Sequence, residues 1–436
     1  MRLIRLFKRD LAKESAGWVK DNLISQDQAE AICERYGIDY HNAANHSYGY
    51  AVLVALGYLF IGLAIITLLS ANWEDIPRAV RMLGLLILTA GTNLFALKQY
   101  QNGKESMSIG LFFLGALFYG ASIMLIAQIY HIDEHYPNGI FWWAMGILPL
   151  ALLLQSSLLM MLMTALSYTW FLVEVDLNYY PILFPVFLFA LGWHVFRFKQ
   201  SYILFLALMV GIGFWIEYSL VWYLSDFYRY RFDESHFIYA VGIVISFYGF
   251  SKWLLSRQDQ VLADYGIILN LWVLRFAIIC LLFFSFEWLW EGLIDESWEQ
   301  PALTLGIAAI FCAIAFVLAF LGNKQIYSTL GFIITYLLST TMVIWVENDF
   351  YAIYFQIATN MVLVIMGVWL IIRGIRDGLT HYFFLGVSTI LLTGLLRYID
   401  LVGDYIGAAI LFIIFAVILL SAARFWKTHK QEKQIT

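Results

Sequence analysis

Two histidines and a glutamate fall within five residues at His131-Ile132-Asp133-Glu134-His135. One class of zinc peptidases uses this H-x-x-E-H spacing to present two imidazole ligands and a general base. That chemistry needs both histidines on one helical face and a third ligand. Here Pro137-Asn138-Gly139 follows at once, which indicates a loop, and no catalytic domain accompanies the motif. We therefore predict no catalytic metal and no cofactor, with an adventitious or structural metal at His131 and His135 as the alternative.

Glu217 and Arg275 are the charged residues placed well inside predicted membrane spans. A charge within a bilayer is costly and usually faces the protein interior or a water-filled cavity. With a helical rise of about 1.5 Å per residue, Glu217 lies about 9 Å and Arg275 about 20 Å below the predicted exterior edge. A direct contact between the two side chains therefore requires that the span edges differ from the predicted ones or that both long side chains extend toward each other. The alternatives are a functional pair, a structural pair, and a Glu217 side chain that snorkels to the surface.

A further group of polar and aromatic residues is predicted near exterior ends of spans: Asn72, Trp73, Gln128, Tyr130, His131, Arg397 and Asp400. Such side chains can close a binding site between the first and third spans. They can equally cap helix ends and anchor the chain at the membrane interface, where tryptophan and tyrosine are enriched. Both interpretations stay open from the sequence.

The elements that must position these residues are membrane helices. The chain of 436 residues is 62% hydrophobic and 13% charged, about half the charged share of a soluble domain. Its apolar runs match the length of about 20 residues that crosses a bilayer core. We predict an all-α polytopic bundle of fourteen spans, with twelve or thirteen as alternatives because the fourth and fifth are short. The predicted spans are Tyr50–Ser70, Ala79–Leu97, Met107–Ile126, Gly139–Leu154, Leu158–Val173, Tyr180–Val195, Ser201–Tyr223, His236–Leu255, Tyr265–Trp288, Ala302–Leu321, Ile326–Trp345, Tyr351–Ile372, His381–Leu396 and Tyr405–Ala422.

The positive charges favour one side of these spans. Of the 26 lysines and arginines, 20 fall in the termini and alternate loops, five on the opposite side and one within a span. Because positive residues are enriched in cytoplasmic loops, both termini are predicted to lie in the cytoplasm. The exterior loops are acidic and rich in tryptophan. That pattern is typical of an interfacial belt, and the alternative is a surface for a cation or a sugar.

Residues 1–48 are predicted to form a cytoplasmic amphipathic helical hairpin, followed by a transmembrane domain over 49–423 and a basic tail over 424–436. Ser25-Gln26-Asp27-Gln28 fits a capping box at the start of the second helix, and Gly37 fits its end. Two short helices bury little, so the hairpin needs the membrane surface, a second copy of itself or a protein partner. Seven cations balance seven carboxylates there, which argues against nucleic-acid binding.

Several function classes lack their sequence signatures. We find no Gly-rich phosphate loop or nucleophile elbow, which argues against ATP-driven transport by this chain alone. Exterior loops of at most about 15 residues are shorter than membrane glycosyltransferases normally carry. Cys280 and Cys312 lie in apolar runs and Cys33 in the N-terminal arm, so no disulfide is predicted.

Several segments resemble a bacterial family of predicted membrane proteins, domain of unknown function 2157. The resemblance covers mainly residues 10–145, with weaker support near the C-terminus. Its segments are Ser70-Ala71-Asn72-Trp73-Glu74-Asp75-Ile76-Pro77, Ala127-Gln128-Ile129-Tyr130-His131, Trp18-Val19, Leu23-Ile24-Ser25 with Ala29, and Leu396-Arg397-Tyr398-Ile399-Asp400. The resemblance implies a protein of the bacterial cytoplasmic (inner) membrane and no particular activity. His135 stands outside the shared pattern, which weakens the zinc interpretation.

Three functions remain open from the sequence. The first is a transporter or lipid-handling protein with a cavity lined by Glu217, Arg275 and exterior polar residues, whose ligand is a membrane lipid, a small solute or a lipid-linked molecule. The second is a non-catalytic scaffold or sensor that recruits a partner, or a second copy of the chain, through residues 1–48. The third is a membrane enzyme acting on a lipid-linked substrate at the exterior face; overall, a non-enzymatic role is favoured.

Overall fold

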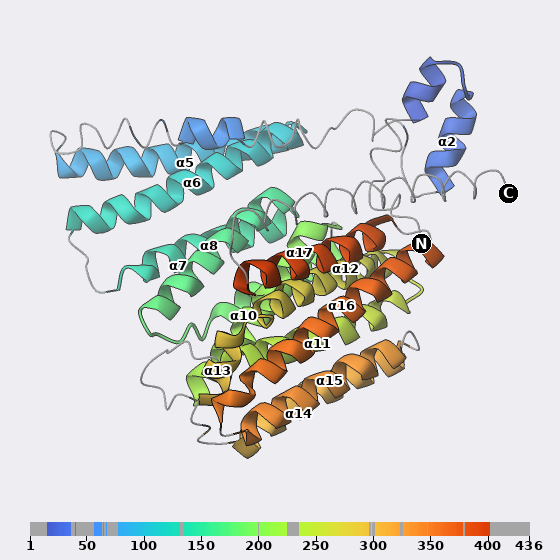
Figure 1. Ribbon diagram of the computed structural model, residues 1–436. Coiled ribbons are helices and arrows are strands. Elements are labelled where there is room, and N and C mark those ends of the chain that lie inside the picture. The colour runs from blue at the N-terminus through green and yellow to red at the C-terminus, as the bar shows by residue number, and fades with distance from the viewer. Residues whose placement is uncertain are drawn as a thin grey trace. The chain divides into compact units, whose positions relative to one another are not determined.

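The computed structural model is built from α-helices, and the residues that it describes contain no strand. These residues are 15–35, 40, 56–62, 64, 67, 77–130, 135–198, 200–224, 235–295, 298, 301–322, 326–346, 348–377 and 380–401. They divide into two compact units, one within Met1–Tyr230 and one within Arg231–Thr436. Figure 1 shows both units as sets of packed helices. The first and last predicted spans fall largely or wholly outside the described residues, as does the predicted tail.

The N-terminal unit holds a chain of neighbouring helices. Helix α5 packs against α6, and α6 contacts α7 and α8. Helices α7 and α8 pack together, and α9 contacts α7, α8 and α10. Figure 1 shows the pairs α5–α6 and α7–α8 lying side by side. The bounds are α2 Gln26–Arg35, α5 Arg78–Gln101, α6 Glu105–Tyr130, α7 Pro137–Leu153, α8 Ser157–Asp176, α9 Phe184–Arg197 and α10 Tyr202–Leu224.

The C-terminal unit is organised around α11, which contacts α12, α14 and α15. Helix α16 packs against α17 and also contacts α12 and the short α13. In Figure 1, α14 and α15 form a neighbouring pair at one edge of this unit. The bounds are α11 Ser235–Leu255, α12 Gln260–Phe283, α13 Glu287–Asp295, α14 Pro301–Leu321, α15 Ile326–Trp345, the 3₁₀ helix η2 Asp349–Tyr351, α16 Ala352–Asp377 and α17 Thr380–Leu401.

Nine helices in the described part of the chain are long and apolar enough to cross a membrane, at 20 to 25 residues each. Helices α7 and α9 are shorter apolar helices. The chain is therefore a membrane protein with several apolar helices, as its composition predicts. Every predicted span from Ala79–Leu97 to His381–Leu396 overlaps at least one helix. The total of fourteen and the cytoplasmic placement of the termini stay predictions.

The structure differs from the sequence prediction around the ninth span. Helix α12 begins at Gln260 instead of Tyr265, because Asp259 caps it by accepting a hydrogen bond from the Val261 amide at 2.8 Å. Helix α12 ends at Phe283, and a separate helix, α13, follows where a loop was expected. Four residues of α13 are buried at helical spacing: Leu289, Trp290, Leu293 and Ile294. Burial of this apolar face stabilises the short helix against its neighbours.

The described part of the N-terminal arm is helical at residues 15–20 and in α2. Ser15 Oγ lies 3.4 Å from Cys33 Sγ, which joins the two helices. The predicted capping box is confirmed. The Gln28 amide donates to Ser25 Oγ at 3.3 Å, and the Ser25 amide donates to Gln28 Oε1 at 2.9 Å. Gly37 and the first residues of the arm lie outside the described part.

Candidate functional site

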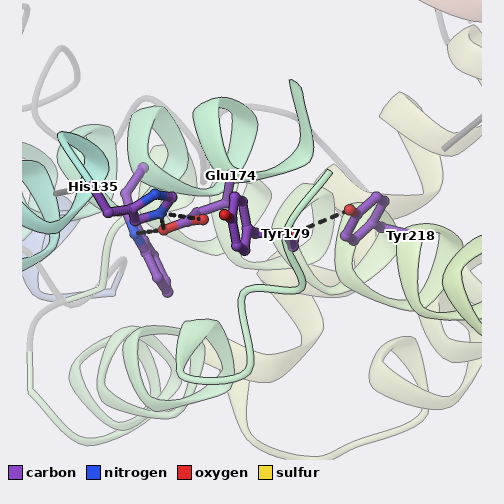
Figure 2. Close-up of polar contacts among 5 residues, drawn as sticks. His135, Glu174, Tyr179 and Tyr218 are labelled. Carbon is purple, nitrogen blue, oxygen red and sulfur yellow. Dashed lines mark hydrogen bonds and ion pairs between the residues drawn. The ribbon is translucent and has the colours of Figure 1, made fainter. Parts of the chain in front are cut away.

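A buried carboxylate lies near the end of α8 in the N-terminal unit. Glu174 is 5% exposed, and both of its carboxylate oxygens lie 2.9 Å from His135 Nε2. The indole of Trp170, one turn earlier on α8, donates to Glu174 Oε1 at 2.8 Å. Figure 2 shows His135 and Glu174 facing each other. Two ring nitrogens thus satisfy a carboxylate that would otherwise be costly to bury.

This pairing bears on the predicted metal motif. His135 comes from the segment just before α7, and its ring packs edge-on against Tyr179 with centroids 4.6 Å apart. His131 and Glu134 lie outside the described residues. Among the described residues, no group of three or more His, Cys, Asp or Glu side chains is placed to hold a metal ion. The polar contact that the structure gives the His135 ring is with Glu174.

Aromatic residues continue from this carboxylate toward α10. Tyr218 on α10 donates to the backbone carbonyl of Tyr179 at 3.0 Å, as Figure 2 shows. The Tyr180 hydroxyl lies 2.8 Å from Ser219 Oγ, and its ring stacks on Tyr218. These contacts fix the connection after α8 onto α10. They pack the region around the Glu174 carboxylate, and among the described contacts they bring no further charged group to it.

The two predicted intramembrane charges fall in different units. Glu217 lies on α10 in the N-terminal unit, and both of its carboxylate oxygens are buried. Arg275 lies on α12 in the C-terminal unit, and its guanidinium is 5.2 Å from the centroid of the Trp272 ring. Their pairing stays a prediction. Cation–π contact along one helix supplies Arg275 with part of its stabilisation.

The predicted exterior polar residues are described only in part. The Tyr130 hydroxyl contacts Met82 Sδ at 3.3 Å within the N-terminal unit. Arg397 Nη2 lies 3.5 Å from Ser285 Oγ, and its guanidinium is 5.0 Å from the Phe286 ring centroid in the C-terminal unit. Gln128 and Asp400 lie in α6 and α17, but their side chains are outside the description, as are Asn72, Trp73 and His131. The structure does not test a site formed by all seven.

The C-terminal unit contains a cavity of about 540 Å³. Its walls come from α11, α12, α13, α15 and α16, and neither Glu217 nor Arg275 lines it. The lining is almost entirely apolar and aromatic, and includes Ile245, Ala277, Leu281, Phe332, Ala358 and Trp369. Several hydroxyl-bearing residues of α15, among them Thr335 and Ser339, share the wall. Such a volume falls within the range of about 300–1,000 Å³ that is usual for small-molecule sites.

A polar network lies about two helical turns beyond Ile245 of α11 and Ala277 of α12, the nearest cavity-lining residues of those helices. Lys252 on α11 is 1% exposed, and its Nζ donates to Asn270 Oδ1 on α12 at 2.5 Å. Asn270 Nδ2 in turn donates to the Tyr382 hydroxyl on α17 at 2.8 Å. The Lys252 ammonium also lies 4.2 Å from the centroid of the Tyr248 ring. A buried lysine thus links three helices through neutral partners.

Further basic residues surround this network. Arg373 on α16 lies over the rings of Trp369 and Tyr382, each centroid 5.1 Å away. Its charge acts on Lys252 and on His381. Arg275 also acts electrostatically on His381, whose ring packs on Tyr382 with centroids 4.3 Å apart. The set Lys252, Arg275, Arg373 and His381 is called the basic cluster below.

Sequence reasoning missed this cluster. It assigned Lys252 and Arg373 to the excess of positive charge on the cytoplasmic side, as residues at span ends. The available signal is the spacing: Tyr248 precedes Lys252 by one turn, and Trp369 precedes Arg373 by one turn. An aromatic residue one turn before a cation places its ring beside the charge on a helix. Asn270, inside an apolar run, is a second signal.

Comparison with known proteins gives a family match over about a third of the chain. Residues 16–160 match the model of the family described as predicted membrane protein (DUF2157). The resemblance stated from the sequence is thereby confirmed, and the match lies wholly within the N-terminal unit. No curated protein and no solved structure gives a significant match.

Proposed function

We propose that this membrane protein handles a lipid, holding an apolar chain in the cavity of its C-terminal unit. The observation that carries the proposal is the cavity of about 540 Å³ between α11, α12, α13, α15 and α16. Apolar helices in a membrane normally pack closely through small residues. A space of this size within one helical unit therefore suits a molecule that shares the chemistry of its walls.

The character of the lining supports a hydrocarbon ligand over a water-soluble solute. Aromatic and aliphatic side chains such as Phe237, Leu281 and Trp290 form most of the walls. A solute with many hydrogen-bonding groups would lose its hydration against such walls without replacement. An acyl or prenyl chain loses nothing comparable, because it carries no hydrogen-bonding groups along its length.

The proposal narrows the first function expected from the sequence to lipid binding, and it assigns the cavity wall to different residues. The sequence expectation places Glu217 and Arg275 at a cavity, which stays a prediction; the cavity proposed here is lined by other residues, all of the C-terminal unit. Transport and storage of the lipid both begin with this binding step. Binding is therefore the property to test first.

The test is native mass spectrometry of the full chain extracted into native-lipid nanodiscs. We expect a lipid bound at a stoichiometry near one. Ala358→Leu adds bulk to the cavity wall and should reduce that occupancy severalfold. Ala309→Leu is the matched control, because Ala309 is an exposed alanine on α14 outside the lining. Equal occupancy in wild type, Ala358→Leu and Ala309→Leu, or only bulk lipid in all three, would contradict the proposal.

A further inference from the structure

We infer that the basic cluster of the C-terminal unit recognises the anionic phosphate headgroup of the lipid whose chain occupies the neighbouring cavity. The inference rests on the proposed function and names its ligand class, an acidic phospholipid. Three features carry it: contacts that join the cluster to the cavity, an excess of positive charge, and buried polar groups that suit an anion.

Two separate contacts connect the cluster to the end of the cavity. Trp369 lines the cavity, and the Arg373 guanidinium lies 5.1 Å from its ring centroid. Phe332 also lines the cavity, and Tyr248 packs edge-on against it with centroids 5.1 Å apart. The Lys252 ammonium lies 4.2 Å from the centroid of the same Tyr248 ring. A molecule with its chain in the cavity therefore has its polar end within reach of cations.

The charge at this end is positive. Lys252, Arg275 and Arg373 bring three cations from α11, α12 and α16. Among the side chains that the structure describes, Asp264 on α12 is the buried carboxylate of this unit; it is 2% exposed and lies six residues before Asn270. Even with Asp264 ionised, the three cations outnumber this carboxylate among the described side chains. An anion attracted by this excess would relieve the repulsion between Lys252 and Arg373.

The hydrogen-bonding inventory also suits an anion. Lys252 contacts the neutral side chains of Asn270 and Tyr248, and no carboxylate of the described residues pairs with it. The Tyr248 hydroxyl and His381 Nδ1 are buried and have no hydrogen-bond partner among the described residues. Lysine and arginine offer only donors, and the fork of an arginine matches phosphate oxygens. A phosphate could accept from several of these groups at once.

A lipid phosphate fits this arrangement better than free phosphate. The cluster lies in a membrane helix unit beside an apolar cavity, so the favourable binding of the chain adds to that of the headgroup. Free phosphate would gain only the second contribution while losing its full hydration. We therefore expect excess inorganic phosphate to leave the bound lipid in place.

The experiment compares acidic and zwitterionic lipids in competition. Full-length protein is equilibrated in nanodiscs containing equal amounts of phosphatidylglycerol and phosphatidylethanolamine, and the retained lipid is identified by native mass spectrometry. The wild type should retain the acidic lipid preferentially. Lys252→Met and Arg373→Gln should each reduce this preference about tenfold, the scale of one charge-assisted hydrogen bond, while total lipid occupancy persists. Arg373→Lys keeps the charge and should restore much of the preference.

The matched control is Arg257→Gln, which removes an exposed cation that stacks on Trp253 close to the same helix end. It should leave lipid preference unchanged. Size-exclusion profiles establish that each variant is folded. Unchanged preference in folded Lys252→Met and Arg373→Gln would overturn the headgroup assignment while leaving the lipid cavity intact. Loss of preference in Arg257→Gln to the same degree would equally overturn it, because surface charge alone would then suffice. If the wild-type protein instead retained no stoichiometric lipid, that result would contradict the proposed lipid-binding function itself.

Discussion

His135 Nε2 lies 2.9 Å from each carboxylate oxygen of Glu174, so one imidazole joins the segment before α7 to the end of α8. The two side chains are 24% and 6% exposed, which keeps the pair largely out of water. The Trp170 indole occupies a further acceptor position of the same carboxylate. The contact therefore fixes the connection at one end of the α7–α8 pair.

We predict that His135 and Glu174 are energetically coupled. A double-mutant cycle with His135→Ala and Glu174→Gln should give a coupling free energy of about 0.5–3 kcal/mol, the range for residues in direct contact. The coupling is expected to be stabilising, because removing His135 leaves the buried Glu174 carboxylate with only the Trp170 donor. The measurement is reversible unfolding in mixed detergent micelles. Additive effects of the two substitutions would show that the pair contributes no stability.

We predict that Asn270 stabilises the unit by satisfying Lys252. In Asn270→Leu the buried ammonium loses its hydrogen-bond acceptor, and Tyr382 loses a donor. The expected loss is about 1–3 kcal/mol of unfolding free energy, the cost of an unsatisfied buried polar group. The double substitution Asn270→Leu with Lys252→Met removes both partners and should recover part of it. A double variant less stable than Asn270→Leu would contradict this account.

The sequence predicts those features of the fold that depend on residues close together in the chain, and it misses those that depend on contacts between distant segments. Long apolar runs predict the helices, because burial of backbone polar groups in lipid forces helix formation within each run. The capping box at Ser25 is local and was predicted from four adjacent residues. Helix α13 was missed because its apolar face, including Leu289 and Leu293, is short and is stabilised by packing against distant helices.

The candidate sites follow the same division. Glu217 and Arg275 stand out in the sequence because they are charges in apolar runs. Lys252 does not stand out, because a lysine near the end of a span is normally interpreted as one whose side chain extends to the membrane interface. Only its contact with Asn270, 18 residues away, and the contact of Asn270 with Tyr382, 112 residues away, reveal a buried network. Likewise, no local pattern pairs His135 with Glu174.

We predict that the capping box sets the local stability of α2. Ser25→Ala removes the acceptor for the Gln28 amide and should destabilise the helix by about 0.5–2 kcal/mol. Faster amide hydrogen exchange in the first turn of α2 is the measurement. Gln26→Ala serves as control, since it breaks only an exposed side-chain contact with Glu30 of 3.0 Å, which is worth about 0.2–0.5 kcal/mol. Equal protection in Ser25→Ala and wild type would exclude a stabilising cap.

We predict that Gly249 is required for the approach of α11 to α14. A Cβ at this position would lie 2.4 Å from the Ala315 carbonyl oxygen and 2.7 Å from its Cα, and backbone atoms cannot rotate away. Gly249→Ala should therefore force the helices apart and cost about 1–3 kcal/mol of stability.

The matched control for Gly249→Ala is Gly306→Ala, because a Cβ at Gly306 on α14 would meet nothing within 4 Å. Alanine also favours the helical backbone over glycine by about 1 kcal/mol, so Gly306→Ala should hold or raise the unfolding midpoint. Thermal unfolding in detergent compares the two. If both variants unfold at the wild-type midpoint, close packing of α11 on α14 is not what stabilises this unit. If only Gly249→Ala unfolds earlier, the loss reports that interhelical contact, because both variants make the same change of residue.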